Sequence, residues 1–185
     1  MEGATKTAII VSSTREGRFA DIVAHWFVKT ARERTDMAFD VIDLAEANLP
    51  ARIPAGPDHN VAAFRRRVAE ADAYVVITPE YNHSFPASLK QAIDLASDGW
   101  AAKPVGFVSY GGRSGGLRAV EQLRQVFPEV RATTVRDVVS FHGAWNEFGD
   151  DGSPVNASDC NAAANTMLDQ LAWWANALKT ARIAA

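Results

Sequence analysis

The chain has 185 residues, of which 48% are hydrophobic and 22% are charged. These values are ordinary for a folded soluble domain and support neither a disordered chain nor a membrane protein. Nineteen basic residues nearly balance twenty-two acidic ones, so the net charge of -3 offers no global attraction to nucleic acid or anionic lipid. We therefore expect a single domain over residues 1–185, with no nucleic-acid or membrane partner.

The first half of the chain alternates between strand and helix patterns. Residues 7–11 are continuously apolar, which predicts a buried strand, and apolar residues at helical spacing follow from Phe19 through Ile22 and Trp26 to Phe27. Residues 39–43 alternate in polarity, which fits an edge strand. A proline-rich segment, residues 47–58, indicates a loop before a second helical stripe, which is Val61, Phe64, Val68 and Ala71.

The second half repeats this alternation. Buried strands are predicted at residues 73–77 and 105–108, and a weaker strand at residues 135–141 would close the far edge of the sheet. The helical stripes that follow them are residues 89–96 with Pro86 in the first turn, residues 117–127 stopped by Pro128, and residues 167–178 entered from Asn156 or Ser158 as N-cap.

Five alternations of strand and helix predict a parallel sheet with helices on both faces. Right-handed crossovers make a doubly wound α/β fold the simplest topology for such a chain. Ligands of these folds bind where the strands end, at their carboxyl edge. The loops after the first, third and fourth strands are therefore the candidate site.

The loop after the first strand, residues 12–18, reads Ser-Ser-Thr-Arg-Glu-Gly-Arg and leads directly into a helix. Free N–H groups at the helix start, the helix dipole and the guanidinium groups of Arg15 and Arg18 would all favour a phosphate. The alternative is that Ser13 or Thr14 simply caps the helix and the arginines are solvated. The loop matches neither a P-loop nor the dinucleotide fingerprint, which disfavours an ATPase or a Rossmann dehydrogenase.

The other two loops suggest a site for a flat ring. Residues 78–86 combine two prolines with Tyr81 and Phe85, and such a stiff, aromatic loop suits a planar heterocycle such as a flavin. Residues 109–116 hold four glycines, which permit close approach of backbone to ligand, and the cation Arg113. Alternatively, the aromatics only cover the next helix and the glycines form a flexible turn. The coincidence of all three loops at one edge favours a ligand site.

At these loops the chain resembles the NAD(P)H-dependent FMN reductases of the flavodoxin-like superfamily, which include quinone and chromate reductases. The resemblance covers roughly residues 5–180 and is most specific at residues 79–90, while Ser12 replaces a usual glycine. It implies a flavodoxin-like sheet of order 2-1-3-4-5, bound FMN, NADPH or NADH as co-substrate, and a homodimer or tetramer that packs its third and fourth helices near the flavin. The expected cofactor-binding residues are Ser13, Arg15, Arg18, Phe19, Pro79, Glu80, Tyr81, Asn82, Ser109, Tyr110, Gly111, Gly112 and Arg113.

The predicted function is a cytoplasmic oxidoreductase in which NAD(P)H donates hydride to FMN and the flavin reduces a small-molecule acceptor, such as a flavin or quinone. No catalytic acid or base is expected, since the cofactor performs the chemistry. Lone Cys160 agrees with a reducing compartment. One alternative is a flavodoxin-like electron carrier or FMN-binding interaction protein without nicotinamide activity. Another is a reductase that releases reduced FMN to a partner monooxygenase.

A few further residues carry weaker expectations. The four histidines show no spacing typical of metal ligands, so no metal site is expected, and His83 alone lies where it could bind flavin or substrate. Arg113 or Arg118 could meet the 2′-phosphate of NADPH. Trp173 and Trp174 are expected in the core and at an interface.

Overall fold

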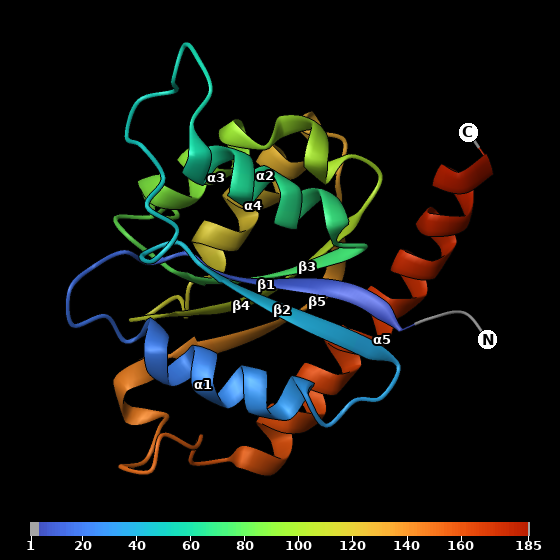
Figure 1. Ribbon diagram of the computed structural model, residues 1–185. Coiled ribbons are helices and arrows are strands. Elements are labelled where there is room, and N and C mark those ends of the chain that lie inside the picture. The colour runs from blue at the N-terminus through green and yellow to red at the C-terminus, as the bar shows by residue number, and fades with distance from the viewer. Residues whose placement is uncertain (1–3, 185) are drawn as a thin grey trace.

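A parallel sheet of five strands organises residues 4–184, the part of the chain that the computed structural model describes (Figure 1). Its order is β2-β1-β3-β4-β5, with every neighbouring pair parallel. The predicted strands and their order are therefore confirmed. The strands are β1 (Thr5–Val11), β2 (Met37–Asp43), β3 (Ala73–Pro79), β4 (Pro104–Gly111) and β5 (Thr133–His142).

Helices cover both faces of this sheet. In Figure 1, α1 and most of α5 lie on one face, and α2, α3 and α4 lie on the other. Within the described residues the helices are α1 (Ala20–Ala31), α2 (His59–Glu70), α3 (Ala87–Leu95), α4 (Leu117–Glu129) and α5 (Ala157–Ala184), with short 3-10 helices η1 (Ser97–Trp100) and η2 (Ala144–Asn146).

The strand patterns explain this double layer. Alternate side chains of β1 enter opposite cores: Ile9 packs with α1 and α5, and Ile10 packs with the α2–α4 layer. All seven residues of β3 are buried, as a central parallel strand requires, whereas β2 alternates as an edge strand. This arrangement brings the loops after β1, β3 and β4 to one edge of the sheet.

Four residues of the helices differ from the sequence predictions. Pro128 lies inside α4, which ends only at Glu129, because a proline removes its own N–H but does not prevent the last turn from closing. Pro86 is the N-cap of α3 and not part of its first turn. Trp173, expected in the core and at an interface, is 65% exposed on α5 and so lies outside the core, and Ile22 is exposed on α1. Periodicity alone overestimated how wide the buried stripes are.

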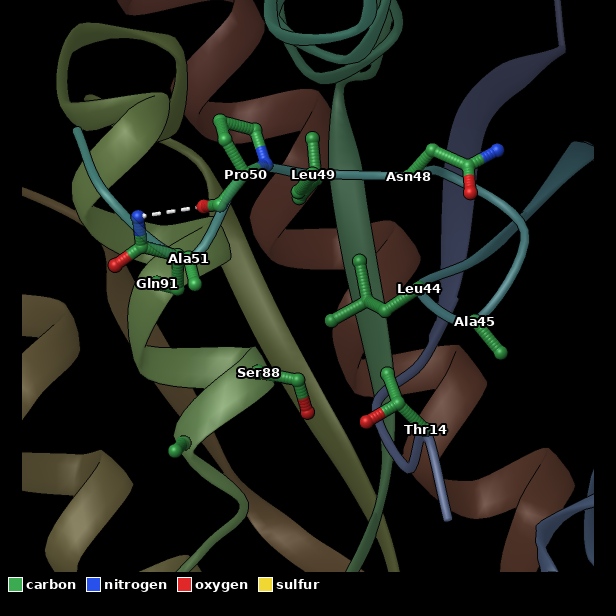
Figure 2. Close-up of a pocket in the computed structure, with 10 residues that line it drawn as sticks. Thr14, Leu44, Ala45, Asn48, Leu49, Pro50, Ala51, Ser88 and Gln91 are labelled. Atoms are coloured by element: carbon green, nitrogen blue, oxygen red, sulfur yellow. Dashed lines mark hydrogen bonds between the residues drawn. The ribbon is translucent and has the colours of Figure 1, made fainter. Parts of the chain in front are cut away.

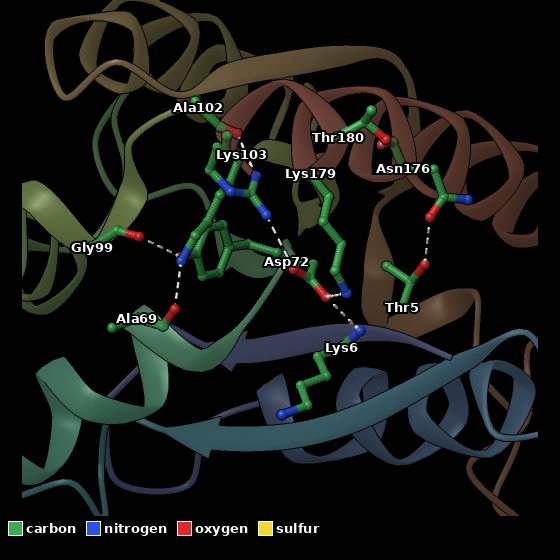
Figure 3. Close-up of polar contacts among 12 residues, drawn as sticks. Thr5, Lys6, Ala69, Asp72, Gly99, Ala102, Lys103, Asn176, Lys179 and Thr180 are labelled. Carbon is green, nitrogen blue, oxygen red and sulfur yellow. Dashed lines mark hydrogen bonds and ion pairs between the residues drawn. The ribbon is translucent and has the colours of Figure 1, made fainter. Parts of the chain in front are cut away.

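The amino edge of the sheet, opposite the candidate site, is held by a buried carboxylate (Figure 3). Asp72, just before β3, accepts hydrogen bonds from Lys179 Nζ at 2.9 Å and from Arg182 Nη2 at 3.0 Å, both on α5. It also accepts the backbone N–H of Lys6 at 3.3 Å. Asp72 therefore fastens the end of the long C-terminal helix to two central strands.

No helix of residues 4–184 combines the length and the hydrophobicity that crossing a membrane would need.

Lys103, just before β4, is buried at the same edge. Its ammonium group donates to the carbonyls of Val68 and Ala69 at 3.1 and 2.8 Å, and to the hydroxyl of Tyr74 at 3.1 Å. The pKa of Lys103 is lowered from 10.5 to about 8, mainly by burial and also by the positive charge of Arg182, while Asp72 opposes the shift. The folded protein therefore releases this proton at a lower pH than the unfolded chain does.

This difference predicts that stability rises with pH in alkaline solution. Between the folded and unfolded pKa values the unfolded chain binds more protons, so raising the pH favours the folded state. From about pH 7.5 to about pH 10 the free energy of unfolding should rise by roughly 2 kcal/mol more in the unchanged protein than in Lys103→Met. Urea titrations at both pH values measure this difference. Parallel pH profiles for the two proteins would show that Lys103 keeps an ordinary pKa.

Candidate functional site

The loops at the carboxyl edge of the sheet enclose a cavity of about 360 Å³. This volume lies within the range of about 300–1,000 Å³ typical of small-molecule sites. The loops after β1, β3 and β4 supply most of the wall, and η2, which follows β5, closes the rim. The lining residues are Ser13, Arg15, Gly17, Arg18, Phe19, Pro79, Glu80, Tyr81, Tyr110, Gly111, Gly112 and Trp145.

Most of the residues predicted at the cofactor therefore meet in one cavity, but three do not line it. Ser109 is fully buried, and its hydroxyl donates to the carbonyl of Gly115 at 2.8 Å. Asn82 and Arg113 are exposed at the tips of their loops. Gly17 and Trp145 line the cavity although sequence reasoning did not select them. Nothing in the local pattern around Trp145 indicates that η2 returns to this edge.

The loop after β1, residues 12–18, is named the phosphate loop after the ligand that the sequence predicts, and it leads into an uncapped helix. The N-cap of α1 is Phe19, which makes no side-chain capping bond, so neither Ser13 nor Thr14 caps this helix. Within residues 4–184, the backbone N–H groups of Thr14, Glu16 and Gly17 donate no hydrogen bond. The exposed guanidinium of Arg15 has no carboxylate at ion-pair distance among the same residues. The loop therefore presents unpaired donors and a free cation, as an anion site requires.

Arg18, which also lines the cavity, is hydrogen-bonded within the protein. Its Nε donates to Asp21 at 2.8 Å, and its Nη1 donates to the carbonyl of Ser13 at 2.5 Å and to Asp43 at 2.7 Å. Its Nη2 contacts the second oxygen of Asp43 and, at 2.7 Å, Asp21. The hydrogen bond with Asp43 raises the pKa of Arg18 above its ordinary value. Four of the five N–H donors of this guanidinium are therefore hydrogen-bonded within the protein, and its charge is paired with two carboxylates.

The loop after β3 is a rigid hairpin. Tyr81 and Ser84 exchange both backbone hydrogen bonds, at 2.8 and 3.0 Å, around Asn82 and His83, which have φ of 50° and 73°. Two consecutive positive φ angles in a two-residue turn are typical of a type I′ turn. This turn places the Tyr81 hydroxyl 2.7 Å from Ser13 Oγ. The hairpin is thus joined to the loop after β1 through these two hydroxyl groups, while His83 stays at the exposed tip outside the cavity.

Glu80 joins the second loop to the third. Its carboxylate accepts hydrogen bonds from the hydroxyl of Ser114, from the backbone N–H of Arg118 at 3.2 Å, and from the Arg118 guanidinium at 3.2 Å. A carboxylate at the first turn of α4 also interacts favourably with the helix dipole. Arg118, one of the two candidates for a 2′-phosphate contact, therefore already has a partner, which leaves Arg113 as the freer cation.

The glycine-rich loop is packed and is not a flexible turn. The carbonyl of Gly115 accepts the hydroxyls of Ser109 and Ser140, at 2.8 and 2.9 Å. The N–H of Gly143 donates to the carbonyl of Gly112 at 2.8 Å. Gly116, with φ of 85°, starts α4 so close to β4 that a Cβ would lie 2.8 Å from the backbone nitrogen of Tyr110. The wall formed by Gly111 and Gly112 is consequently well ordered.

A second cavity lies beyond the phosphate loop (Figure 2). It has a volume of about 440 Å³ and is lined by Thr14, the segment after β2 and the start of α3. Gln91 Nε2 donates to the carbonyl of Pro50 at 3.0 Å across its rim. No charged side chain lines this cavity. Among residues 4–184, the unpaired cation Arg15 and the rigid loops after β3 and β4 line the first cavity and not this one, so the first cavity is the better site for an anionic, planar ligand.

The geometry agrees with what comparison with known proteins finds. A family model described as NADPH-dependent FMN reductase matches residues 5–146. Over 130 residues the chain is 33% identical to the NAD(P)H-dependent FMN reductase of Schizosaccharomyces pombe, a match that covers 65% of this chain and 64% of that protein. It is 35% identical over 115 residues to the 2-hydroxy-1,4-benzoquinone reductase of a Burkholderia species, with 62% of this chain and 59% of that protein covered.

A solved structure extends the similarity to nearly the whole chain. The flavoenzyme NAD(P)H:(acceptor) oxidoreductase FerB from Paracoccus denitrificans superposes with a TM-score of 0.74, covering 91% of this chain and 97% of that one. At 23% identity this likeness shows the shared fold. The matches to the two curated relatives span about three fifths of their lengths.

Proposed function

This chain belongs to the NADPH-dependent FMN reductase family, and on that premise we propose that it binds FMN and transfers electrons from NADPH or NADH to a small-molecule acceptor. The observation that carries the proposal is one cavity that joins an anion-binding end to a rigid, flat-sided end. When bound, FMN supplies the hydride and electron chemistry, and the protein supplies binding, orientation and electrostatics.

The residues of the cavity fit the two ends of FMN. Arg15 and Gly17 line the cavity, and Thr14 and Glu16 belong to the same loop. The guanidinium of Arg15 and the free N–H groups of this loop would hold the phosphate. Tyr81 and the Gly111–Gly112 segment would border the ring, where the missing side chains allow close backbone approach. Arg18 acts as an internal brace that fixes the phosphate loop.

Tyr110 would contribute a neutral wall to this pocket. Burial raises the pKa of its phenol above the ordinary value, and the neighbouring Tyr81 acts in the same direction. Because the phenol therefore stays protonated in neutral solution, it places no negative charge beside the ring. A neutral phenol beside the ring would not disfavour the negative charge that a flavin gains on reduction.

As the small-molecule acceptor we propose a quinone, since one of the relatives is named as a benzoquinone reductase. A homodimer or tetramer, a partner monooxygenase and a cytoplasmic location remain predictions from the sequence. So do the contacts of Asn82, Ser109 and Arg113 with the cofactor, which lie outside the lining of the cavity.

The proposed activity is tested by mixing the purified protein with FMN, NADPH or NADH, and a simple benzoquinone. We expect nicotinamide oxidation well above the rate with free FMN alone, and faster oxidation when the quinone is present. A protein that binds FMN but leaves both nicotinamides unoxidised would instead be an electron carrier or an FMN-binding interaction protein.

The phosphate end of the site gives a quantitative prediction. Replacing Arg15 with alanine removes one charged contact, so FMN binding should weaken by about 1.5–3 kcal/mol. Because Arg15 is exposed and unpaired, the free energy of unfolding should not change. The control is Arg66→Ala, which removes an exposed arginine from α2, remote from the cavity. Equal FMN affinities for the two variants, measured by titration of apoprotein, would show that Arg15 points into solvent.

A further inference from the structure

Trp145 is a large apolar side chain that the fold leaves uncovered at the rim of the candidate FMN cavity. Its side chain belongs to the lining of that cavity, yet the residue is 64% exposed. A scattered exposed hydrophobic residue needs no explanation. An exposed hydrophobic residue that lines a candidate ligand cavity is different, because a ligand bound there would cover it and remove it from water.

The backbone around Trp145 is fixed. Ala144 is fully buried in the core beneath α1 and α5. The N–H of Gly143 donates to the carbonyl of Gly112 at 2.8 Å, which ties η2 to the glycine-rich loop, and the N–H of Glu147 donates to the carbonyl of Ala144 at 3.0 Å. The indole is therefore held on an ordered turn, and little backbone entropy would be lost when a ligand covers it.

The position of the indole relative to Gly112 shows what it could cover. A Cβ added to Gly112 would lie 3.7 Å from Cη2 of Trp145, so the indole is close to the part of the loop where a side chain is missing. The aromatic ring therefore stands beside the wall that is expected to border the flavin. Aromatic rings gain energy from packing on one another beyond the area that they bury.

We propose that Trp145 packs against the isoalloxazine ring of bound FMN and sets the affinity of the site for the flavin. The inference rests on the proposed function and adds a residue from a fourth loop to the three that the sequence indicates. The contact of Trp145 would involve the ring of the cofactor and not its phosphate. Loss of the indole should therefore weaken binding of FMN and of riboflavin, which lacks the phosphate, by a similar factor.

The test compares Trp145→Ala with Trp173→Ala, a control that removes an equally exposed tryptophan, at 65%, from α5. The apoproteins are titrated with FMN and with riboflavin. We expect Trp145→Ala to raise both dissociation constants by about tenfold, and Trp145→Phe to recover most of the affinity. The fluorescence of the bound flavin, which a neighbouring indole quenches, should increase in Trp145→Ala. The control should change neither quantity.

Other outcomes would overturn the inference in distinguishable ways. If the unchanged protein binds FMN and Trp145→Ala binds it equally well with the same flavin fluorescence, Trp145 does not contact the ring and the proposed function still holds. If Trp145→Ala changes the sedimentation of the protein without changing flavin affinity, a second copy of the chain covers the indole. If the unchanged protein binds no FMN, the proposed function itself fails.

Discussion

Replacing Gly116 with alanine is expected to destabilise the folded protein by roughly 2–5 kcal/mol. Gly116 has φ of 85°, a region that disfavours side chains, and its added Cβ would lie 2.7 Å from Cβ of Ser109 and 2.8 Å from the backbone nitrogen of Tyr110. The clash involves the backbone of a central strand, which cannot move aside as a flexible side chain would. Denaturant titration of the variant measures the loss.

The same substitution should also weaken FMN binding, because relief of the clash must displace Tyr110 or the start of α4. For the loss of stability, and not for FMN binding, Gly112→Ala is the matched control within the same loop. Its φ is not in the left-handed region, and the nearest atom to the new Cβ is Trp145 Cη2 at 3.7 Å, an ordinary contact. We expect this control to change the free energy of unfolding by less than about 1 kcal/mol. If Gly116→Ala were as stable as Gly112→Ala, the loop would be looser than the packing indicates.

The second large effect is expected for Arg18→Ala. The side chains of Arg18 and Asp43 are only 12% and 18% exposed. Removal of the guanidinium takes the cation away from a largely buried carboxylate, which keeps the backbone N–H of Ala45 at 2.9 Å, and takes away the donor to the carbonyl of Ser13. Breaking a buried ion pair in this way should lower the free energy of unfolding by roughly 2–4 kcal/mol. FMN affinity should fall as well, because the phosphate loop loses its brace.

Comparison with Arg15→Ala distinguishes an arginine that stabilises the phosphate loop from one that contacts the phosphate of FMN. We expect Arg18→Ala to lower both stability and FMN affinity, and Arg15→Ala to lower affinity alone. Asp43→Asn should reproduce the effects of Arg18→Ala in weaker form, since it keeps the shape of the side chain but removes the charge. Should Arg18→Ala weaken FMN binding with no loss of stability, Arg18 would contact the phosphate directly, as the sequence alone suggested.

The sequence by itself determined the fold and the edge of the sheet where the candidate site lies. The continuous apolar runs of β1, β3 and β4 predict central parallel strands, and the loops that follow them must meet at one edge. Residues such as Tyr81 and Gly112 could be selected because turn chemistry and backbone freedom are properties of a short segment. These local features can be recognised in a short segment without knowing which residues from other parts of the chain contact it.

Only the tertiary structure decided how the individual side chains are used. Arg18 and Arg15 look alike in sequence, but Arg18 meets Asp43 because β2 lies beside β1, and Arg15 meets no carboxylate among the described residues. Glu80, after β3, similarly pairs with Arg118 in the first turn of α4, and Trp145 lies at the cavity because the chain turns back toward it after β5. Partners of this kind depend on distances through space between segments far apart in the chain, which hydrophobic periodicity and motif spacing do not encode.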